Sequence, residues 1–129
     1  MSFGEAEALK RRTEAFLRNA ESLLEAGEWD LAVFNLVQHC QLILKYRLLV
    51  AKGVYPRTHS IRRLLRELAS EHPELLSLVE EEDKLHYLAR LEEAYIASRG
   101  LPYTYEERKA PGLYRFVREV FRPLVEGVR

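Results

Sequence analysis

The chain has 129 residues, of which 47% are hydrophobic, and this is enough for one domain to bury a core without support from disulfides or metal ions. The 20 basic and 20 acidic residues cancel, which argues against a protein whose whole surface binds polyanions, so any nucleic-acid binding must be local. Cys40 is the only cysteine, which excludes an intrachain disulfide and a cysteine-based zinc site.

The first predicted helix covers residues 5–26. Apolar residues recur there near helical spacing, and charged residues occupy the other positions. Gly27 follows directly, and glycine is the residue that most often ends a helix. The stretch before and within this helix lacks the apolar run of a signal peptide, so we expect a cytoplasmic protein.

Residues 29–50 form the predicted central helix. Their apolar side chains continue around the helix instead of keeping to one stripe, which indicates neighbours on most sides. Lys45 and Arg47 interrupt the run, and their burial in hydrocarbon would be costly, so we expect no membrane span. Cys40 lies within this helix and is expected to be a buried apolar residue, not a nucleophile.

A third helix is predicted over residues 59–71. Pro56 keeps the preceding residues out of helical geometry, and Thr58 is a good N-cap. Pro73 cannot continue the helix comfortably and should end it.

Two further helical segments complete the chain. Residues 74–98 are predicted to be helical, with a break among the acidic residues 80–83, where like charges crowd together. A last helix should run over residues 111–126, and Pro123 should kink or fray its end. No segment alternates with a period of two. The expected fold is therefore all-α: an antiparallel bundle of about five helices, forming one domain over residues 1–129.

The sequence contains no recognisable catalytic or metal site. A dimetal site in a helical bundle needs glutamates from facing helices and two Glu-x-x-His pairs, whereas only Asp83 and His86 have a comparable spacing. No glycine-rich phosphate loop, paired catalytic carboxylates or Ser-His-Asp set is present. The acidic run at 80–83 is interpreted as a solvated face. We expect no catalytic residue, no metal and no cofactor.

Two basic clusters are the most informative polar features. One lies at the start of the third helix and comprises Arg57, Arg62, Arg63 and Arg66. The other is a stripe on the last helix and comprises Arg115, Arg118 and Arg122. Either could hold phosphate. The alternative, favoured by the net charge of zero, is that they pair with acidic residues on other helices.

Three short segments of the chain carry a family resemblance. The first comprises Gly27, Glu28, Trp29, Asp30, Leu31 and Ala32, followed by Gln38, Gln41, Leu44 and Lys45. The second comprises Pro56, Thr58, His59, Ser60, Ile61, Leu64 and Leu65. The third comprises Tyr95, Ala97, Ser98 and Arg99, with Pro102 soon after. In order and spacing they resemble motifs of the HEPN family, the helical domains named for higher eukaryotes and prokaryotes nucleotide-binding, over nearly the whole chain.

The resemblance implies a homodimeric helical domain that binds a nucleotide or works beside a small nucleotidyltransferase, often as a toxin and antitoxin pair. The apolar character of residues 29–50 also predicts a homodimer, because an exposed patch of that size invites association. The possible partners are thus a second copy of the chain, a nucleotidyltransferase, and a nucleotide or RNA.

The candidate nucleotide or phosphate contacts are Arg99, Tyr95, Lys45, Gln38 and His59. Arg99 ends a helix before a loop, and its guanidinium offers the paired donors that phosphate oxygens accept. Tyr95 shares a helix face with Arg99 and could stack a base, while Lys45 could add a second positive charge. Two alternatives stay open: Arg99 closes the bundle by bonding a carboxylate or helix carbonyls, and His59 is structural.

Departures from the family pattern bear on catalysis. Gln41 stands where a glutamate is usual. Ribonuclease members carry an arginine, four to six residues and then a histidine on a late helix, and no histidine follows Arg99. Arg66 and His72 have that spacing but lie on an earlier helix, which Pro73 should end. We therefore expect no ribonuclease activity. The alternatives are a ribonuclease with an atypical site and a non-catalytic homodimeric assembly module.

Overall fold

The structure, a computed structural model, describes residues 3–98 and 109–127. Its elements are α1 (Phe3–Glu25), α2 (Trp29–Lys52), α3 (Ile61–Ala69), the 3-10 turn η1 (Pro73–Leu76), α4 (Ser77–Glu80), α5 (Glu82–Ser98), α6 (Lys109–Phe116), the π turn η2 (Val117–Phe121) and α7 (Arg122–Glu126). No strand occurs in these residues, and the all-α prediction is confirmed. None of the helices within the described ranges combines the length and the hydropathy of a membrane-spanning segment.

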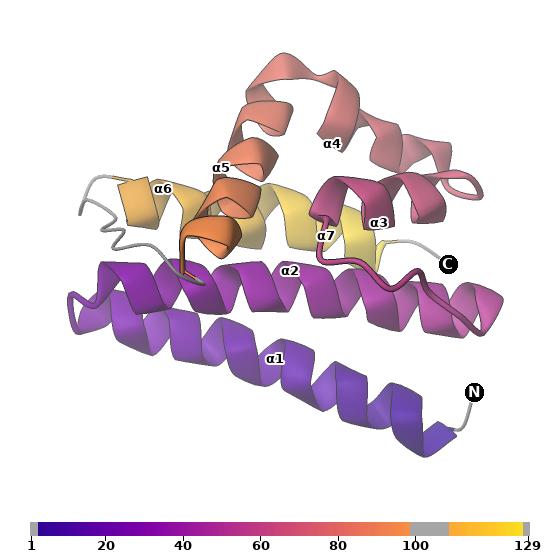
Figure 1. Ribbon diagram of the computed structural model, residues 1–129, viewed down its shortest axis with the longest axis horizontal. Coiled ribbons are helices and arrows are strands. Elements are labelled where there is room, and N and C mark those ends of the chain that lie inside the picture. Colours follow the sequence, from indigo (N-terminus) through magenta and orange to yellow (C-terminus); the bar gives the residue numbers. More distant parts are fainter. Residues whose placement is uncertain (1–2, 99–108, 128–129) are drawn as a thin grey trace.

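Helices α1 and α2 form an antiparallel pair that runs along the longest axis of the molecule (Figure 1). Gly27 lies between them with φ of 76°, and its N–H donates to the carbonyl of Leu24 at 3.1 Å. The N–H of Glu28 reaches the carbonyl of Leu23 at 2.8 Å. These two bonds are the Schellman pattern that ends a helix, and they confirm the predicted role of Gly27.

Helix α2 is the central element, as predicted. It contacts α1, α3, α5, α6 and α7, and Figure 1 shows α1 on one side of it and the later helices on the other. Eleven of its 24 residues are buried, so neighbours within the same chain cover most of its apolar surface. Leu36 and Ile43 are among them, at 0% and 4% exposed, and belong to the core. Gly53 ends α2 with φ of 79° and donates its N–H to the carbonyl of Leu49.

The predicted N-cap of the third helix was wrong by two residues. Ser60, not Thr58, caps α3: its backbone is extended, and its hydroxyl accepts from the N–H of Arg63 at 3.2 Å. The Thr58 hydroxyl instead accepts from the N–H of Ser60 at 3.1 Å, which holds the residues before the helix in a turn. The helix ends at Ala69, before Pro73, which starts η1.

Glu92 of α5 ties α5 to the start of α3. One carboxylate oxygen accepts from the Arg62 N–H at 2.8 Å and from the Ser60 hydroxyl at 3.2 Å. The other accepts from Nε and Nη2 of Arg62 at 3.1 and 2.9 Å. The Glu92 side chain is only 14% exposed. A carboxylate at a helix N-terminus also interacts favourably with the helix dipole, so Glu92 acts as a cap supplied by another helix.

The predicted break among the acidic residues 80–83 is confirmed. Glu81 has ψ of 123° and separates α4 from α5, because an extended residue cannot continue either helix. Its carbonyl accepts from the N–H of Leu85 at 2.9 Å, and its carboxylate lies 2.6 Å from Nζ of Lys84. All four acidic residues are exposed, as expected of a solvated face.

The last predicted helix is present but divides at a π turn. Pro123 lacks an N–H, and directly before it Arg122 donates its N–H to the carbonyl of Val117, five residues back. The π turn η2 lies directly before the turn that contains Pro123, and the helix continues past the proline through α7 instead of fraying there.

His39 is the most buried titratable ring of α2. It is 0% exposed, and its Nδ1 lies 2.8 Å from the carbonyl oxygen of Thr13 on α1, while its Nε2 has no partner within the described part of the chain. Burial lowers the pKa of His39, and this outweighs the opposing effect of the hydrogen bond to Thr13. The ring is therefore held in its neutral form, with Nδ1–H donating to α1.

Replacement of Glu92 should weaken the contact between α3 and α5. We expect Glu92→Gln to lower the free energy of unfolding by about 1–3 kcal/mol, because the Arg62 guanidinium loses its charged partner and the α3 cap loses an acceptor. Urea denaturation measures the change. The matched control is Glu93→Gln, at the exposed neighbouring position, which should change the stability by less than about 0.5 kcal/mol. Equal effects of the two substitutions would contradict the assigned role.

Stability should fall on mild acidification because of His39. Its pKa is lower in the folded than in the unfolded chain, so the unfolded chain binds more protons below the ordinary histidine pKa of about 6.5. The stabilisation is complete above that pH and is lost as the pH falls toward the folded-state pKa, by at most about 1.4 kcal/mol per pH unit. Urea denaturation from about pH 7.5 to 5.5 tests this. In His39→Gln the decline should be smaller, and an unchanged decline would assign it to other groups.

Candidate functional site

The candidate ligand contacts described by the structure come from three elements. Gln38 and Lys45 lie on α2, His59 lies in the segment between α2 and α3, and Tyr95 lies on α5. Arg99 falls outside the described residues, so its predicted contact with phosphate remains a prediction. The structure brings His59 and Tyr95 together, and this pair is the centre of the candidate site.

His59 and Tyr95 stack on each other. Their ring centroids are 5.0 Å apart and the ring planes differ by 29°, which is the offset geometry that aromatic rings prefer. His59 is exposed and Tyr95 is half-buried, with its ring also packed against the core. The pair therefore presents a flat, partly exposed surface whose position is fixed from below by the core.

Gln41 fixes the backbone beneath this stack. It is 2% exposed, and its Nε2 donates to the carbonyl of His59 at 2.8 Å. Its Oε1 lies 3.5 Å from Nδ1 of the His59 ring. The amide thus supplies both a donor and an acceptor to one residue, which a glutamate cannot do in its ionised form. In the sequence Gln41 stands out only as a lost charge, because its partner lies 18 residues away in the chain.

Lys45 lies one turn further along α2 than Gln41. Its Nζ is 5.6 Å from the centroid of the Tyr55 ring, which places a cation beside an aromatic face. Burial lowers the pKa of Lys45, and its ammonium forms no ion pair within the described residues. Gln38 lies two turns before Lys45 on the same side of α2, is half-buried and makes no hydrogen bond with any described residue. The Lys45 ammonium and the Gln38 amide are therefore both available to a ligand.

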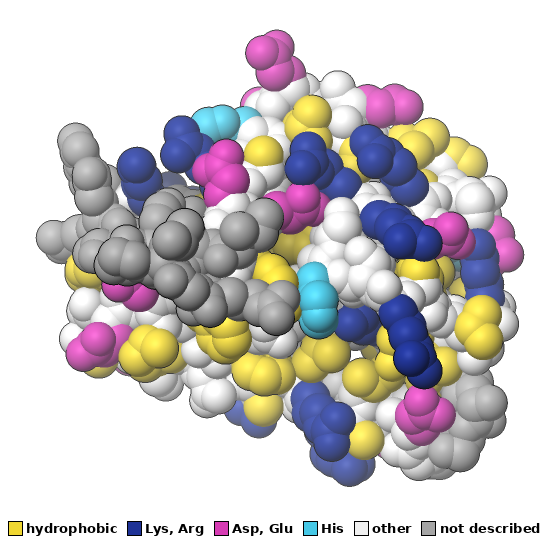
Figure 2. Space-filling view, in the orientation of Figure 1, with side chains coloured by type: hydrophobic (Ala, Val, Ile, Leu, Met, Phe, Trp, Pro, Cys, Tyr) yellow, Lys and Arg dark blue, Asp and Glu magenta, His cyan; other side chains and the backbone are white. Residues whose placement is uncertain are grey.

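The surface beside the stack is locally basic. Residues 52–66 contain five basic and no acidic side chains, and Figure 2 shows Lys and Arg side chains gathering over α3 and the segment that precedes it. The prediction that the arginine cluster pairs with acidic residues of other helices holds for one of its four members, because Arg62 binds Glu92. Lys52 was not part of that cluster, and its Nζ lies 3.7 Å from Glu67. The remaining three are exposed and have no acidic partner within the described residues: Arg57, Arg63 and Arg66.

The second arginine cluster, on α6 to α7, is mostly paired. Arg118 lies 3.0 Å from Glu21 of α1 and also donates to the Tyr114 hydroxyl, and Nε of Arg122 is 2.7 Å from Glu126. Arg115 is exposed and has no acidic partner in the part of the chain that is described. The prediction of pairing with other helices therefore holds for Arg118, whereas the partner of Arg122 lies on the same helix, α7.

The described residues do not assemble a recognisable catalytic centre. Cys40 is fully buried, and burial raises the pKa of its thiol, so it is an apolar core residue as predicted. No three metal-ligating side chains come together in residues 3–98 and 109–127. Nδ1 of His72 lies 3.5 Å from Glu74, and Arg66 is exposed. Among the described residues no hydrogen bond or ion pair joins Arg66 to His72, the two residues whose spacing resembles the ribonuclease motif.

Comparison with known proteins agrees with the motifs and the fold. The family model of the HEPN domain matches residues 6–128, nearly the whole chain. No curated protein and no solved structure matches it. The match includes α1, the central helix α2 and the elements that carry Gln41, His59 and Tyr95. The chain therefore belongs to the HEPN domain family.

Proposed function

We propose that this HEPN domain binds a nucleotide, or the nucleotide unit of an RNA, on the surface formed by α2, the segment after it and α5. The observation that carries the proposal is the stacked pair of His59 and Tyr95, with Lys45 on the adjoining helix and unpaired arginines beside it. A nucleobase has a flat π face, and aromatic side chains stack bases without regard to sequence. Phosphate oxygens then need cations within reach of the same platform.

The charge distribution supports a phosphate-bearing ligand at this surface. Arg57, Arg63 and Arg66 lack acidic partners among the described residues, so a phosphate can bind them without breaking an ion pair. Lys45 is partly desolvated and gains more from an anion than a fully hydrated lysine would. The whole chain is neutral, so the attraction of an anion must come from local groups of basic side chains such as this one. In the proposal Gln38 provides an amide for the ligand, and Arg99 adds a further guanidinium.

Family membership is the basis for proposing that the domain works beside a small nucleotidyltransferase, in a toxin and antitoxin type pair. A stable complex of the two co-expressed proteins supports this role, whereas a chain that only self-associates is a plain assembly module. The third alternative is a ribonuclease with an atypical site. Cleavage of single-stranded RNA that disappears in His72→Ala would revive the pair of Arg66 and His72.

Nucleotide binding is tested by calorimetric titration with ATP and with a short single-stranded RNA. The native chain should bind at least one of them, and Tyr95→Leu should weaken the affinity about tenfold or more, because stacking on an aromatic ring contributes about 1–3 kcal/mol per base. Lys45→Met should weaken it by a similar factor by removing a cation. Leucine and methionine keep apolar volume, so both variants are expected to fold.

Two controls make this titration specific. Lys109→Met removes an exposed lysine at the start of α6 and should leave the affinity unchanged. Arg99→Ala should weaken the affinity if the Arg99 guanidinium takes part, as proposed. If neither ligand binds the native chain, or if Tyr95→Leu and Lys45→Met bind as tightly as it does, the proposed surface is not the ligand site.

We also propose a homodimer that uses the exposed side of α2. Leu31 is 53% exposed, and the half-buried Phe34 and Leu42 follow on the same side of the helix. Figure 2 shows a row of hydrophobic side chains along the lower part of the face, over α2. Leu36 and Ile43 are core residues and cannot report on this contact, since their substitution by glutamate should unfold the chain.

The dimer is tested by light scattering at micromolar concentration. The native chain should have twice the mass of one chain, and Leu31→Glu should give a folded monomer, because an isologous contact places each new charge against the apolar side of the other copy. Val54→Glu is the matched control, because Val54 is 69% exposed but lies beyond the end of α2. A monomeric native chain, or a dimeric Leu31→Glu variant, would rule out this interface.

A further inference from the structure

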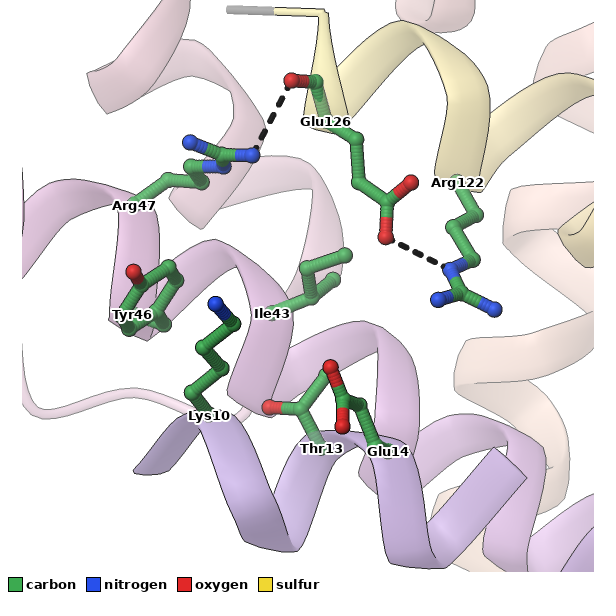
Figure 3. Close-up of a pocket in the computed structure, with 8 residues that line it drawn as sticks. All are labelled: Lys10, Thr13, Glu14, Ile43, Tyr46, Arg47, Arg122 and Glu126. Carbon is green, nitrogen blue, oxygen red and sulfur yellow. Dashed lines mark hydrogen bonds and ion pairs between the residues drawn. The ribbon is translucent and has the colours of Figure 1, made fainter. Parts of the chain in front are cut away.

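A small crevice lies between α1, α2 and α7 and shares no lining residue with the site proposed above. Figure 3 shows its lining, which comprises Lys10, Thr13, Glu14, Ile43, Tyr46, Arg47, Arg122 and Glu126. It encloses about 40 Å³ of space open to water-sized groups. A single water needs roughly 10–15 Å³ by this measure, so the crevice has room for about three or four waters.

Two buried polar atoms of this lining have no hydrogen-bond partner in the part of the chain that the structure describes. The Thr13 hydroxyl belongs to a residue that is 5% exposed, and neither it nor Nε of Arg47 makes a hydrogen bond within the described residues. The Arg47 guanidinium is otherwise engaged, since Nη2 donates to the Glu126 carbonyl at 3.0 Å. A buried donor without an acceptor costs about 1–3 kcal/mol, so native proteins almost always fill such a place with water or a ligand.

The unpaired charges of the crevice define what the ligand must offer. Lys10 and Glu14 form no ion pair within the described residues, whereas Glu126 accepts from Nε of Arg122 at 2.7 Å. Figure 3 shows the Lys10 ammonium extending from α1 toward the α2 side chains, with the Glu14 carboxylate also facing the crevice. A complementary ligand therefore needs acceptors for Lys10 and Arg47 and one acidic hydrogen for Glu14.

We infer that this crevice binds a phosphate group in its monoanionic form, which is H2PO4− for free phosphate and the singly protonated group for a phosphate monoester. Its two unprotonated oxygens accept from Lys10 and Arg47, a third oxygen accepts from the Thr13 hydroxyl through a lone pair, and one P–O–H donates to the Glu14 carboxylate. The four oxygens of a tetrahedral oxyanion are bonded to one central atom, so the ion occupies about the space of the three or four waters that the crevice admits. The lining carries three cations and two carboxylates, so one negative charge on the ligand makes the site neutral.

Glu14 gives the site a selectivity that a simple basic patch lacks. Sulfate has the same shape as phosphate but carries no hydrogen at neutral pH, so it would place an oxygen against the Glu14 carboxylate without a donor. The crevice should therefore prefer phosphate to sulfate. Free phosphate and the terminal phosphate of a nucleoside monophosphate share the required chemistry, and the titration distinguishes them.

The experiment is a calorimetric titration of the full chain at mildly acidic pH with inorganic phosphate, with adenosine monophosphate and with sulfate. Phosphate should bind the native chain, and Thr13→Val and Lys10→Gln should each weaken it about tenfold. Thr13→Val is nearly isosteric and removes only an unpartnered hydroxyl, and Lys10 is exposed, so neither change should unfold the chain. Arg11→Gln is the matched control, because Arg11 is the exposed next residue of α1 and does not line the crevice.

Glu14→Gln is the decisive variant. It should bind sulfate more tightly than the native chain does, because the repulsion is removed, and the preference for phosphate over sulfate should disappear. If adenosine monophosphate binds more tightly than phosphate and Lys10→Gln weakens it, the ligand is a nucleotide phosphate; the reverse order assigns free phosphate. No phosphate binding up to about 10 mM, equal affinity in Lys10→Gln, a native preference for sulfate, or only ordered water in crystals soaked in phosphate would each overturn the inference.

Discussion

Burial of α2 by helices from the same chain is the constraint on which the rest of the structure depends. Leu36, Leu44 and Leu48 are all 0% exposed, and complete burial of each such side chain stabilises the fold by about 1.5–3 kcal/mol. A helix surrounded in this way cannot tolerate a polar side chain without a partner. The partner of the His39 ring is the carbonyl of Thr13, and the partner of the Gln41 amide is the carbonyl of His59. These two bonds set where α1 and the segment after α2 lie along the central helix.

The same arrangement separates the charges of a neutral chain. Residues 52–66 are purely basic in charge, whereas residues 71–83 contain six acidic and no basic side chains. Glu92 joins the basic region to α5 through Arg62 and Ser60, so the stacked ring of Tyr95 is carried by the same helix that holds α3 in place.

Most helices could be predicted from the sequence because their signals are local. Gly27 and the acidic run near Glu81 mark boundaries by their own conformational preferences. The N-cap of α3 could not be predicted in that way, because Thr58 and Ser60 are both good N-cap residues. Ser60 is stabilised as the cap by Glu92, which lies 32 residues later in the chain.

The candidate site was predictable to a similar degree. Tyr95, Lys45 and His59 stand in recognisable motifs, but their relation depends on how α5 meets α2, which no local pattern encodes. Gln41 positions His59 by a hydrogen bond to its backbone carbonyl, in the segment after α2. The crevice beside Thr13 is formed by residues of α1, α2 and α7, which are distant from one another in the sequence. In each case the residue type could be read from the sequence, whereas the relative positions of the residues in the fold could not.

The π turn η2 has a consequence for how the chain can vary in length. A π turn is an α-helix with one residue inserted, and it advances every later side chain by about 100° around the axis. This rotation about the helix axis is what places Val125 in the core, where it is fully buried, and Arg122 and Glu126 in the lining of the crevice. Deletion of one residue from Val117–Phe121 would restore an ordinary helix and at the same time turn the α7 side chains away from α1 and α2. In related chains, the length of this turn and the residues of α7 should therefore change together or not at all.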